Sequence, residues 1–111
     1  MSAPGDDDLW QAVADPTRLK LLDLLVTRGQ ATATMLTADM PVTRQAISKH
    51  LLVLQRVGLV EAHKEGREVR YRVPMRRLAE ATNALSEVAR RWDHRLRAIK
   101  ALAEDAHGRR D

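Results

Sequence analysis

The chain has 111 residues, a formal net charge of +4 and 44% hydrophobic residues, a composition typical of one small folded domain, which excludes a disordered chain. It contains no cysteine, which excludes disulfides, thiolate metal sites and cysteine nucleophiles. No apolar run approaches the ~20 residues that span a bilayer and no signal-peptide pattern opens the chain, so we expect a cytoplasmic protein with no membrane partner.

The N-terminal region is expected to hold a tail and one short helix. We expect residues 1–7 to be a disordered tail, followed by one domain at residues 8–106 and a frayed tail at residues 107–111. A short apolar pattern predicts a first helix that ends near Asp15. Its apolar residues are Leu9, Trp10 and Val13.

A second helix is predicted to start at Asp15-Pro16, because Asp is a good N-cap and Pro suits the first helical position. It runs to about Thr27, and Gly29 stops it. We expect a helix so rich in leucine to be central to the core. Its apolar residues are Leu19, Leu22 and Val26 on one side, broadened by Leu21 and Leu25.

The next two helices are predicted to be joined by a very short turn. The third helix is short, is capped by Thr32 or Thr34, and ends before Pro41. One residue then separates Pro41 from Thr43, the expected N-cap of a fourth helix at residues 43–57. Two helices joined so closely form a helix-turn-helix. The apolar residues of the third helix are Met35, Leu36 and Met40.

The helix at residues 43–57 has one apolar side and one polar side. A helix with such sides suits the major groove of DNA, whereas the alternative is a surface helix with solvated polar residues. The apolar stripe repeats at i, i+4 and i+7 and consists of Ile47, Leu51 and Leu54. The other side, at about 100° per residue, carries Gln45, Ser48, Lys49, Leu52 and Arg56.

Residues 59–73 change to an alternating pattern that predicts a β-hairpin. The segments LVEAHK (59–64) and EVRYRV (68–73) flank a Gly-containing turn. In the second strand, apolar residues alternate with Glu68, Arg70 and Arg72, which predicts one inward face and one basic outward face. A hairpin directly after a helix-turn-helix predicts a mainly α winged helix-turn-helix. The tip would reach phosphates or the minor groove through Lys64 and Arg67, or would simply be solvated.

Positive charge is densest in the part of the chain that holds this helix and hairpin. Residues 1–40 carry three basic and six acidic side chains, a net charge of −3. Residues 41–73 carry seven and three, a net of +4, and residues 74–111 carry nine and six, a net of +3. Binding to the phosphates of a nucleic acid would require such a distribution.

Residues 75–106 form one long helical pattern without Pro or Gly. At ~1.5 Å per residue the helix is more than about 40 Å long, longer than a small core can cover. Its apolar stripe therefore needs a partner, and the simplest partner is the same helix of a second copy. A dimer would place two recognition helices ~34 Å apart on a palindromic site. The stripe consists of Leu78, Ala81, Leu85, Val88, Trp92, Leu96, Ile99 and Leu102.

Three segments, ADPTRLKLLDLL (14–25), PVTRQAISKHLLVLQRVGLV (41–60) and EGREVRYRV (65–73), resemble the ArsR/SmtB family of bacterial winged-helix repressors. The resemblance implies a dimer formed through the terminal helices, which adds Leu9, Trp10 and Val13 to Leu85, Val88, Trp92, Leu96 and Ile99 as interface residues. It also implies contacts with operator DNA. The resemblance assigns these to Thr43, Arg44, Gln45, Ser48, Lys49 and His50 in the helix and to Arg67 and Arg70 in the wing. Two further candidates for contact with DNA follow from position alone, and these are Arg56 on the polar side of the helix and Lys64 at the hairpin tip.

The chain departs from the metal-sensing members of that family. Their sensing cysteines are absent, and Asp93 and His94 are adjacent, so they project about 100° apart and do not easily address one ion. We therefore expect no metal site and no cofactor. The segment 92–104 instead resembles the last helix of a cysteine-free subgroup without a known metal ligand. Two residues near the end of the helix, Glu104 and His107, are expected to be solvated.

His50 has two open interpretations. At 300° from Ile47 it lies near the edge of the buried stripe, where it is either a packed or hydrogen-bonded boundary residue or a phosphate contact.

The function predicted from these features is that of a homodimeric, sequence-specific repressor that binds double-stranded DNA, with its own promoter as one candidate site. The alternatives are a metal-responsive repressor with a site on the last helix, and a winged-helix protein-interaction module without DNA specificity. No catalytic motif is present, so we expect no enzyme activity. The small-molecule inducer is unknown, and Trp10 and Trp92 are candidates to line a pocket for one at the dimer interface.

Overall fold

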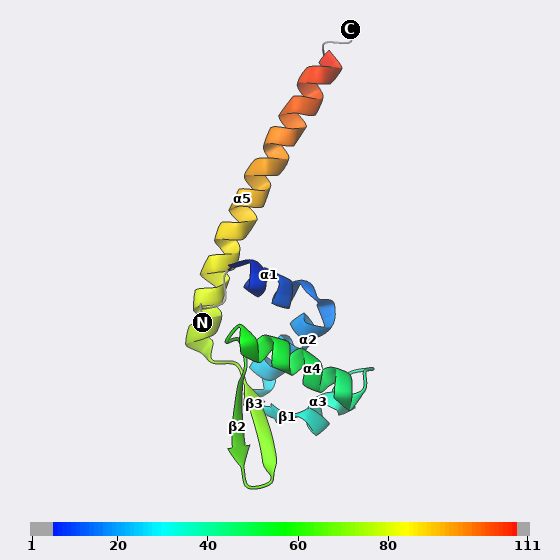
Figure 1. The fold of residues 1–111 in the computed structure, drawn as a ribbon, viewed down its shortest axis with the longest axis vertical. Helices are drawn as coiled ribbons and strands as arrows, with labels where there is room; N and C mark the ends of the chain where they lie inside the picture. Colours follow the sequence, from blue (N-terminus) through cyan, green and yellow to red (C-terminus); the bar gives the residue numbers. More distant parts are fainter. Residues whose placement is uncertain (1–5, 109–111) are drawn as a thin grey trace.

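The computed structural model describes residues 6–108 and consists of a small helical body with one long projecting helix (Figure 1). Most of the expected N-terminal tail and the last three residues of the expected C-terminal tail lie outside the described residues. The predicted fold class, mainly α with a small β-hairpin, is confirmed. The elements are α1 (Asp6–Ala14), α2 (Pro16–Arg28), β1 (Ala31–Thr32), α3 (Ala33–Asp39), α4 (Arg44–Arg56), β2 (Glu61–Glu65), β3 (Glu68–Arg72) and α5 (Met75–Gly108).

The ends of α2 are set by the residues that the sequence indicated. The Asp15 carboxylate accepts hydrogen bonds from the backbone amides of Thr17 and Arg18, at 2.8 and 3.1 Å. The hydrogen bond donated by the Arg18 backbone amide contributes most to holding the pKa of the Asp15 carboxyl below its usual range. At the other end, Gly29 has a φ of 86°, and its amide donates to the Leu25 carbonyl at 2.8 Å.

The helix-turn-helix consists of α3 and α4, and each helix has a threonine cap. Thr32, rather than Thr34, caps α3, because its hydroxyl accepts from the Met35 amide at 3.1 Å. Thr43 caps α4 in the same way, and accepts from the Ala46 amide at 3.1 Å. The predicted bounds of the helix at residues 43–57 are therefore confirmed to within one residue at each end.

The core lies between α2, α3 and α4, and is closed by the residues that follow α4. On α2 the predicted apolar side was only partly correct: Leu19 and Val26 are exposed, while Leu21 and Leu25 are fully buried. The reason is that α4 packs on the side of α2 that carries Leu21 and Leu25. The largest fully buried side chains are Leu21, Leu25, Leu36, Ile47, Leu51, Leu54 and Leu59.

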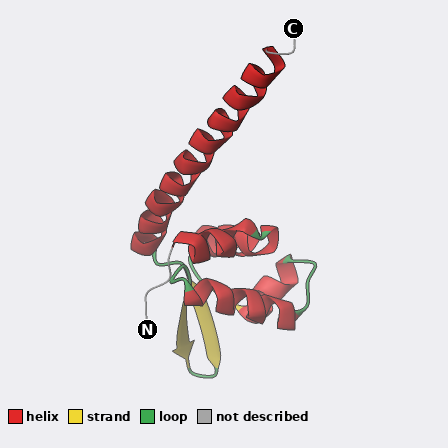
Figure 2. Ribbon diagram, turned by 45° about the horizontal axis from the view of Figure 1, so that its top comes forward, coloured by secondary structure: helices red, strands yellow, loops and turns green. Residues whose placement is uncertain are grey.

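The hairpin, whose two strands are yellow in Figure 2, is part of a three-stranded antiparallel sheet with the order β1-β3-β2. The two-residue strand β1 was not predicted from the sequence, and its Ala31 pairs with Tyr71 of β3. The turn of the hairpin contains only Gly66 and Arg67, and Gly66 has a φ of 60°, a conformation that glycine adopts without strain.

Helix α5 packs against α1 near its start and then projects away from the body, on the side opposite the hairpin tip (Figure 1). Its buried residues are Ala81 and Val88, and every described side chain after Val88 is exposed. Within residues 6–108, none of the helices has the length and apolar character needed to cross a membrane.

Candidate nucleic-acid interface

The two sides of α4 differ in burial as the sequence predicted. Ile47, Leu51 and Leu54 are fully buried and hold the helix against the core. The opposite side is open to solvent, and it includes Leu52, whose exposed fraction is 48%. A row of polar side chains on a rigidly held helix can reach the edges of bases in a major groove. The exposed polar residues of the helix and its cap are Thr43, Arg44, Gln45, Ser48, Lys49 and Arg56.

A hollow of about 530 Å³ lies between the start of α4, α3 and the wing. Arg44 and Ser48 of α4 line it from one side, and Arg67 of the hairpin turn lines it from another. The fold thus brings together two arginines that are far apart in the chain. The remaining lining residues include Thr34 and Met35 of α3, and Val69 and Tyr71 of β3.

Three described arginines have no partner within the described part of the chain. Arg44, Arg56 and Arg67 make no ion pair, hydrogen bond or ring contact, whereas each of the other described arginines makes at least one. An unpaired guanidinium carries a charge that no described residue neutralises, and it can bind a phosphate without first breaking an ion pair with one of them. Arg44 and Arg67, which share one hollow, therefore make a suitable pair of phosphate contacts.

Lys64 lies on the same face of the hairpin as this hollow. It is paired with Val69 in the register of β2 and β3, and directly paired residues project to the same face. Val69 and Tyr71 on that face line the hollow. Lys64 is exposed and forms no ion pair with residues 6–108, so its charge adds to that of Arg44 and Arg67.

The outward face of the hairpin is not the basic surface that the alternation in β3 predicted. The register places Glu61 opposite Arg72 and Glu65 opposite Glu68 on that face. Arg70 donates to Glu68 at 3.0 Å and lies 3.4 Å from Glu65, while Arg72 lies 3.1 Å from Glu61. The alternation within one strand does not show the acidic residues of the neighbouring strand. A contact of Arg70 with DNA would have to compete with these ion pairs.

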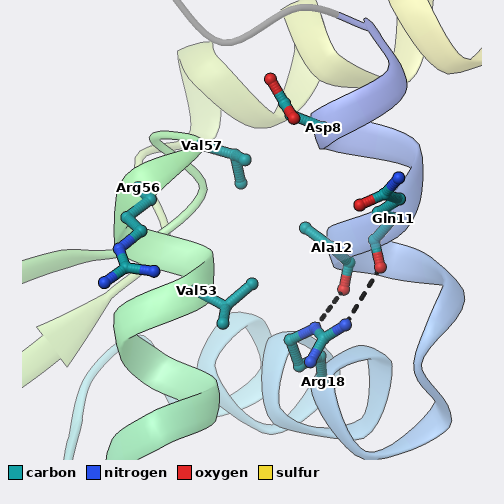
Figure 3. A pocket seen from close by; sticks show the side chains of 7 residues that line it. All are labelled: Asp8, Gln11, Ala12, Arg18, Val53, Arg56 and Val57. Atoms are coloured by element: carbon teal, nitrogen blue, oxygen red, sulfur yellow. Dashed lines mark hydrogen bonds between the residues drawn. The ribbon is translucent and has the colours of Figure 1, made fainter.

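Arg56 lies about 18 Å from Arg44 along the helix axis, at the other end of α4. It lines a different hollow, of about 500 Å³, between α4 and α1 (Figure 3). The structure therefore does not bring Arg56 together with Arg44 and Arg67. The other residues around this second hollow are Asp8, Gln11, Ala12, Arg18, Val53 and Val57.

His50 is half-buried at the edge of α4, and its Nδ1 atom lies 3.2 Å from an Nη1 atom of Arg18. Of its two interpretations, the structure therefore favours the hydrogen-bonded boundary residue. Arg18 was not singled out in the sequence, because its partners lie on other helices. Only its place three residues after the Asp15 cap could have drawn attention to it.

The residues expected at the dimer interface fall into two groups. Leu9 and Val88 are buried within the chain itself, and Val13 and Leu85 are half-buried. The other four, Trp10, Trp92, Leu96 and Ile99, are exposed. An exposed apolar row on a projecting helix is unusual for a monomer, since soluble proteins rarely leave such a surface uncovered.

The acidic groups near the end of α5 are engaged with basic neighbours on the same helix. Asp93 lies 2.7 Å from Arg97, and Glu104 lies 3.9 Å from Lys100. Over the described part of the chain, no three His, Asp or Glu side chains come together as ligands for a metal ion.

A helix-turn-helix followed by a β-hairpin, with an exposed polar recognition helix, defines a winged helix-turn-helix protein. Comparison with known proteins gives the family. A helix-turn-helix domain family matches residues 13–63. The HTH-type transcriptional regulator CmtR of Mycobacterium tuberculosis is 41% identical over 80 residues, which are 72% of this chain and 67% of that protein.

Two further matches agree with this. An ArsR-like transcriptional regulator from Rhodococcus sp. RHA1 has a similar structure, with a TM-score of 0.66, 42% identity, and coverage of 88% of this chain and 92% of that one. A probable mercury resistance operon repressor of Streptomyces lividans is 37% identical over 71 residues, 64% of this chain and 56% of that protein. The chain belongs to the ArsR-type winged helix-turn-helix family of DNA-binding transcription regulators.

Proposed function

We propose that this chain is a homodimeric repressor that binds a palindromic operator, with α4 in the major groove and the hairpin tip on the flanking phosphates. One observation carries the proposal: the unpaired guanidinium groups of Arg44 and Arg67 line one hollow beside the exposed polar side of α4. We also propose that the protein is located in the cytoplasm, since a repressor must reach the promoter that it binds. Repression is supported by the similarity to a relative described as a probable operon repressor.

The homodimer is supported by the apolar row at the end of α5. Trp92, Leu96 and Ile99 recur at helical spacing and are all exposed in the single chain. A second copy of the same helix offers the matching surface, and a closed two-fold dimer covers both rows at once. Two recognition helices related by a two-fold axis read a palindromic site.

Selection of duplexes from a random-sequence library by the purified protein tests the proposed function. We expect the selected duplexes to share one palindromic sequence and to bind at least 1,000 times more tightly than random duplexes, roughly the ratio for specific regulators. Recovery of bound DNA from cells would then locate the same sequence in promoters. A protein-interaction module would enrich no sequence.

Replacing Gln45 by Ala should relax specificity at one base pair, since Gln45 is exposed on the outward side of α4 and its amide suits adenine. We expect a cost of roughly 1–3 kcal/mol on the selected duplex and almost none on random DNA. Fluorescence anisotropy with both duplexes measures the difference. Equal losses on the two duplexes would count against base reading by Gln45.

Replacing Arg67 by Ala should instead weaken binding to all duplexes and reduce the salt dependence of binding by about one phosphate contact. Arg72→Ala is the matched control, because Arg72 lies on the same hairpin but is paired with Glu61. Anisotropy titrations at several salt concentrations give the two slopes. If the Arg67 variant keeps the slope of the unaltered protein, the hairpin turn does not contact phosphate.

A further inference from the structure

Arg18, in the first turn of α2, links the end of α1 to the middle of α4. Its Nε atom donates to the carbonyl of Ala12 at 2.6 Å, and its Nη2 atom donates to the carbonyl of Gln11 at 3.0 Å (Figure 3). Its Nη1 atom lies 3.2 Å from Nδ1 of His50 on α4. The side chain is held in place, since only 17% of it is exposed.

The chemistry of arginine fixes the direction of the bond to His50. A guanidinium group has only donors, so Nη1 of Arg18 donates and Nδ1 of His50 accepts. The imidazole of His50 is therefore neutral in this arrangement, and its ring hydrogen is on Nε2.

Protonation of His50 would break this link. The added proton would occupy Nδ1, and two cations would then face each other across 3.2 Å. The charged groups that face His50 from outside α4 are Arg18 and the Asp15 carboxylate, which lies 3.9 Å from Nη1 of Arg18. Both backbone amides bond to Oδ1 of Asp15, while its Oδ2, at 3.9 Å from Nη1, is outside hydrogen-bond distance of Arg18 and does not replace the lost acceptor in this arrangement.

The link joins two parts of the molecule with different tasks. Helix α1 packs on α5, which carries the exposed apolar row, while α4 carries the exposed polar side. Through Arg18, the carbonyls at the end of α1 and the ring of His50 are held by a single side chain. A change in this link would alter how α4 is seated relative to α1.

We propose that Arg18 and His50 form a pH-sensitive link that positions α4 for DNA binding, and that protonation of His50 releases it. The inference rests on the proposed DNA-binding function and makes Arg18 a positioning residue. DNA affinity then falls as the solution is acidified. If His50 instead contacted a phosphate, DNA affinity would rise as the solution is acidified, because an added positive charge would strengthen binding to DNA.

The test is the pH profile of binding to a labelled duplex selected by the protein from a random library, between about pH 5.5 and pH 8, where histidines titrate. We expect the affinity of the unaltered protein to fall by about tenfold on acidification, the usual effect of a hydrogen bond to a charged group. The His50→Asn variant should lose this fall, because Oδ1 of Asn occupies the place of Nδ1 and does not titrate. His63→Asn is the matched control and should keep it.

Three results would overturn the link: the same acid dependence in the unaltered protein and in His50→Asn, no dependence in either, or tighter binding on acidification that His50→Asn abolishes. Loss of preference for the selected duplex at every pH would overturn the proposed function instead.

If the proposed function is overturned, a measurement without DNA still tests the link between Arg18 and His50. NMR of the His50 ring nitrogens at neutral pH should show the neutral ring with its hydrogen on Nε2, and Arg18→Met should disturb this state in a protein that circular dichroism shows to be folded. A ring with its hydrogen on Nδ1 would overturn the link.

Discussion

A Leu51→Ala substitution is expected to lower the free energy of unfolding by about 2–5 kcal/mol, the range for removing a buried leucine side chain. Leu51 is fully buried in the middle of α4, between Ile47 and Leu54 in the stripe that faces the core. Its removal takes away buried apolar contacts and leaves a cavity in the core beneath α4. In a domain this small, such a loss is a large share of the total stability. Urea denaturation followed by circular dichroism gives the free energy.

The neighbouring residue provides the control for this prediction. Leu52 is in the same helix, but its exposed fraction is 48%, so Leu52→Ala should change the free energy of unfolding by no more than about 0.5 kcal/mol. The pair compares one chemical change on the two sides of α4. Similar losses in the two variants would mean that the helix is not seated on the core as described.

The double substitution Leu96→Glu with Ile99→Glu is expected to produce a folded monomer that has lost most of its affinity for the operator. The exposed fractions of these side chains are 59% and 61%, and they lie outside the core, so the body should keep its structure. Carboxylates placed in an apolar interface would have to be buried without partners, which is costly. A monomer binds one half-site at a time, and it loses the gain of about 100-fold or more that two linked sites provide.

Sedimentation equilibrium measures the assembly, and anisotropy with the selected duplex measures the affinity. Ala101→Glu is the matched control, since Ala101 is on the same exposed part of α5 but on the side of the helix opposite Trp92. A double variant that remains dimeric would move the interface away from this row. A monomer with unchanged operator affinity would show that DNA binding does not need the dimer.

The features that the sequence predicted well are those that depend on neighbours along the chain. The caps at Asp15, Thr32 and Thr43 each act over two or three residues, and the structure contains all three hydrogen-bonded caps. The two sides of α4 follow from helical periodicity alone, because a helix presents every third or fourth residue to the same side.

The features that the sequence did not predict depend on pairing between distant residues. The strand β1 has two residues, too few for a sequence pattern, and it forms because Ala31 pairs with Tyr71 of β3. The balance of charge on the outward face of the hairpin depends on the register that sets Glu61 against Arg72. In both cases the deciding neighbour is on another strand, so no local pattern contains it.

The sequence by itself determined the order of the helices and the hairpin, the helix-turn-helix and the side of α4 that faces away from the core, because local backbone preferences and helical periodicity suffice for these. Only the tertiary structure decided which arginines remain unpaired. It brings Arg44 and Arg67 to one hollow, ties Arg70 to glutamates, and uses Arg18 to join α1 to His50. The physical reason is that an ion pair or hydrogen bond between distant segments depends on distances of about 3 Å, which only the packing of those segments sets.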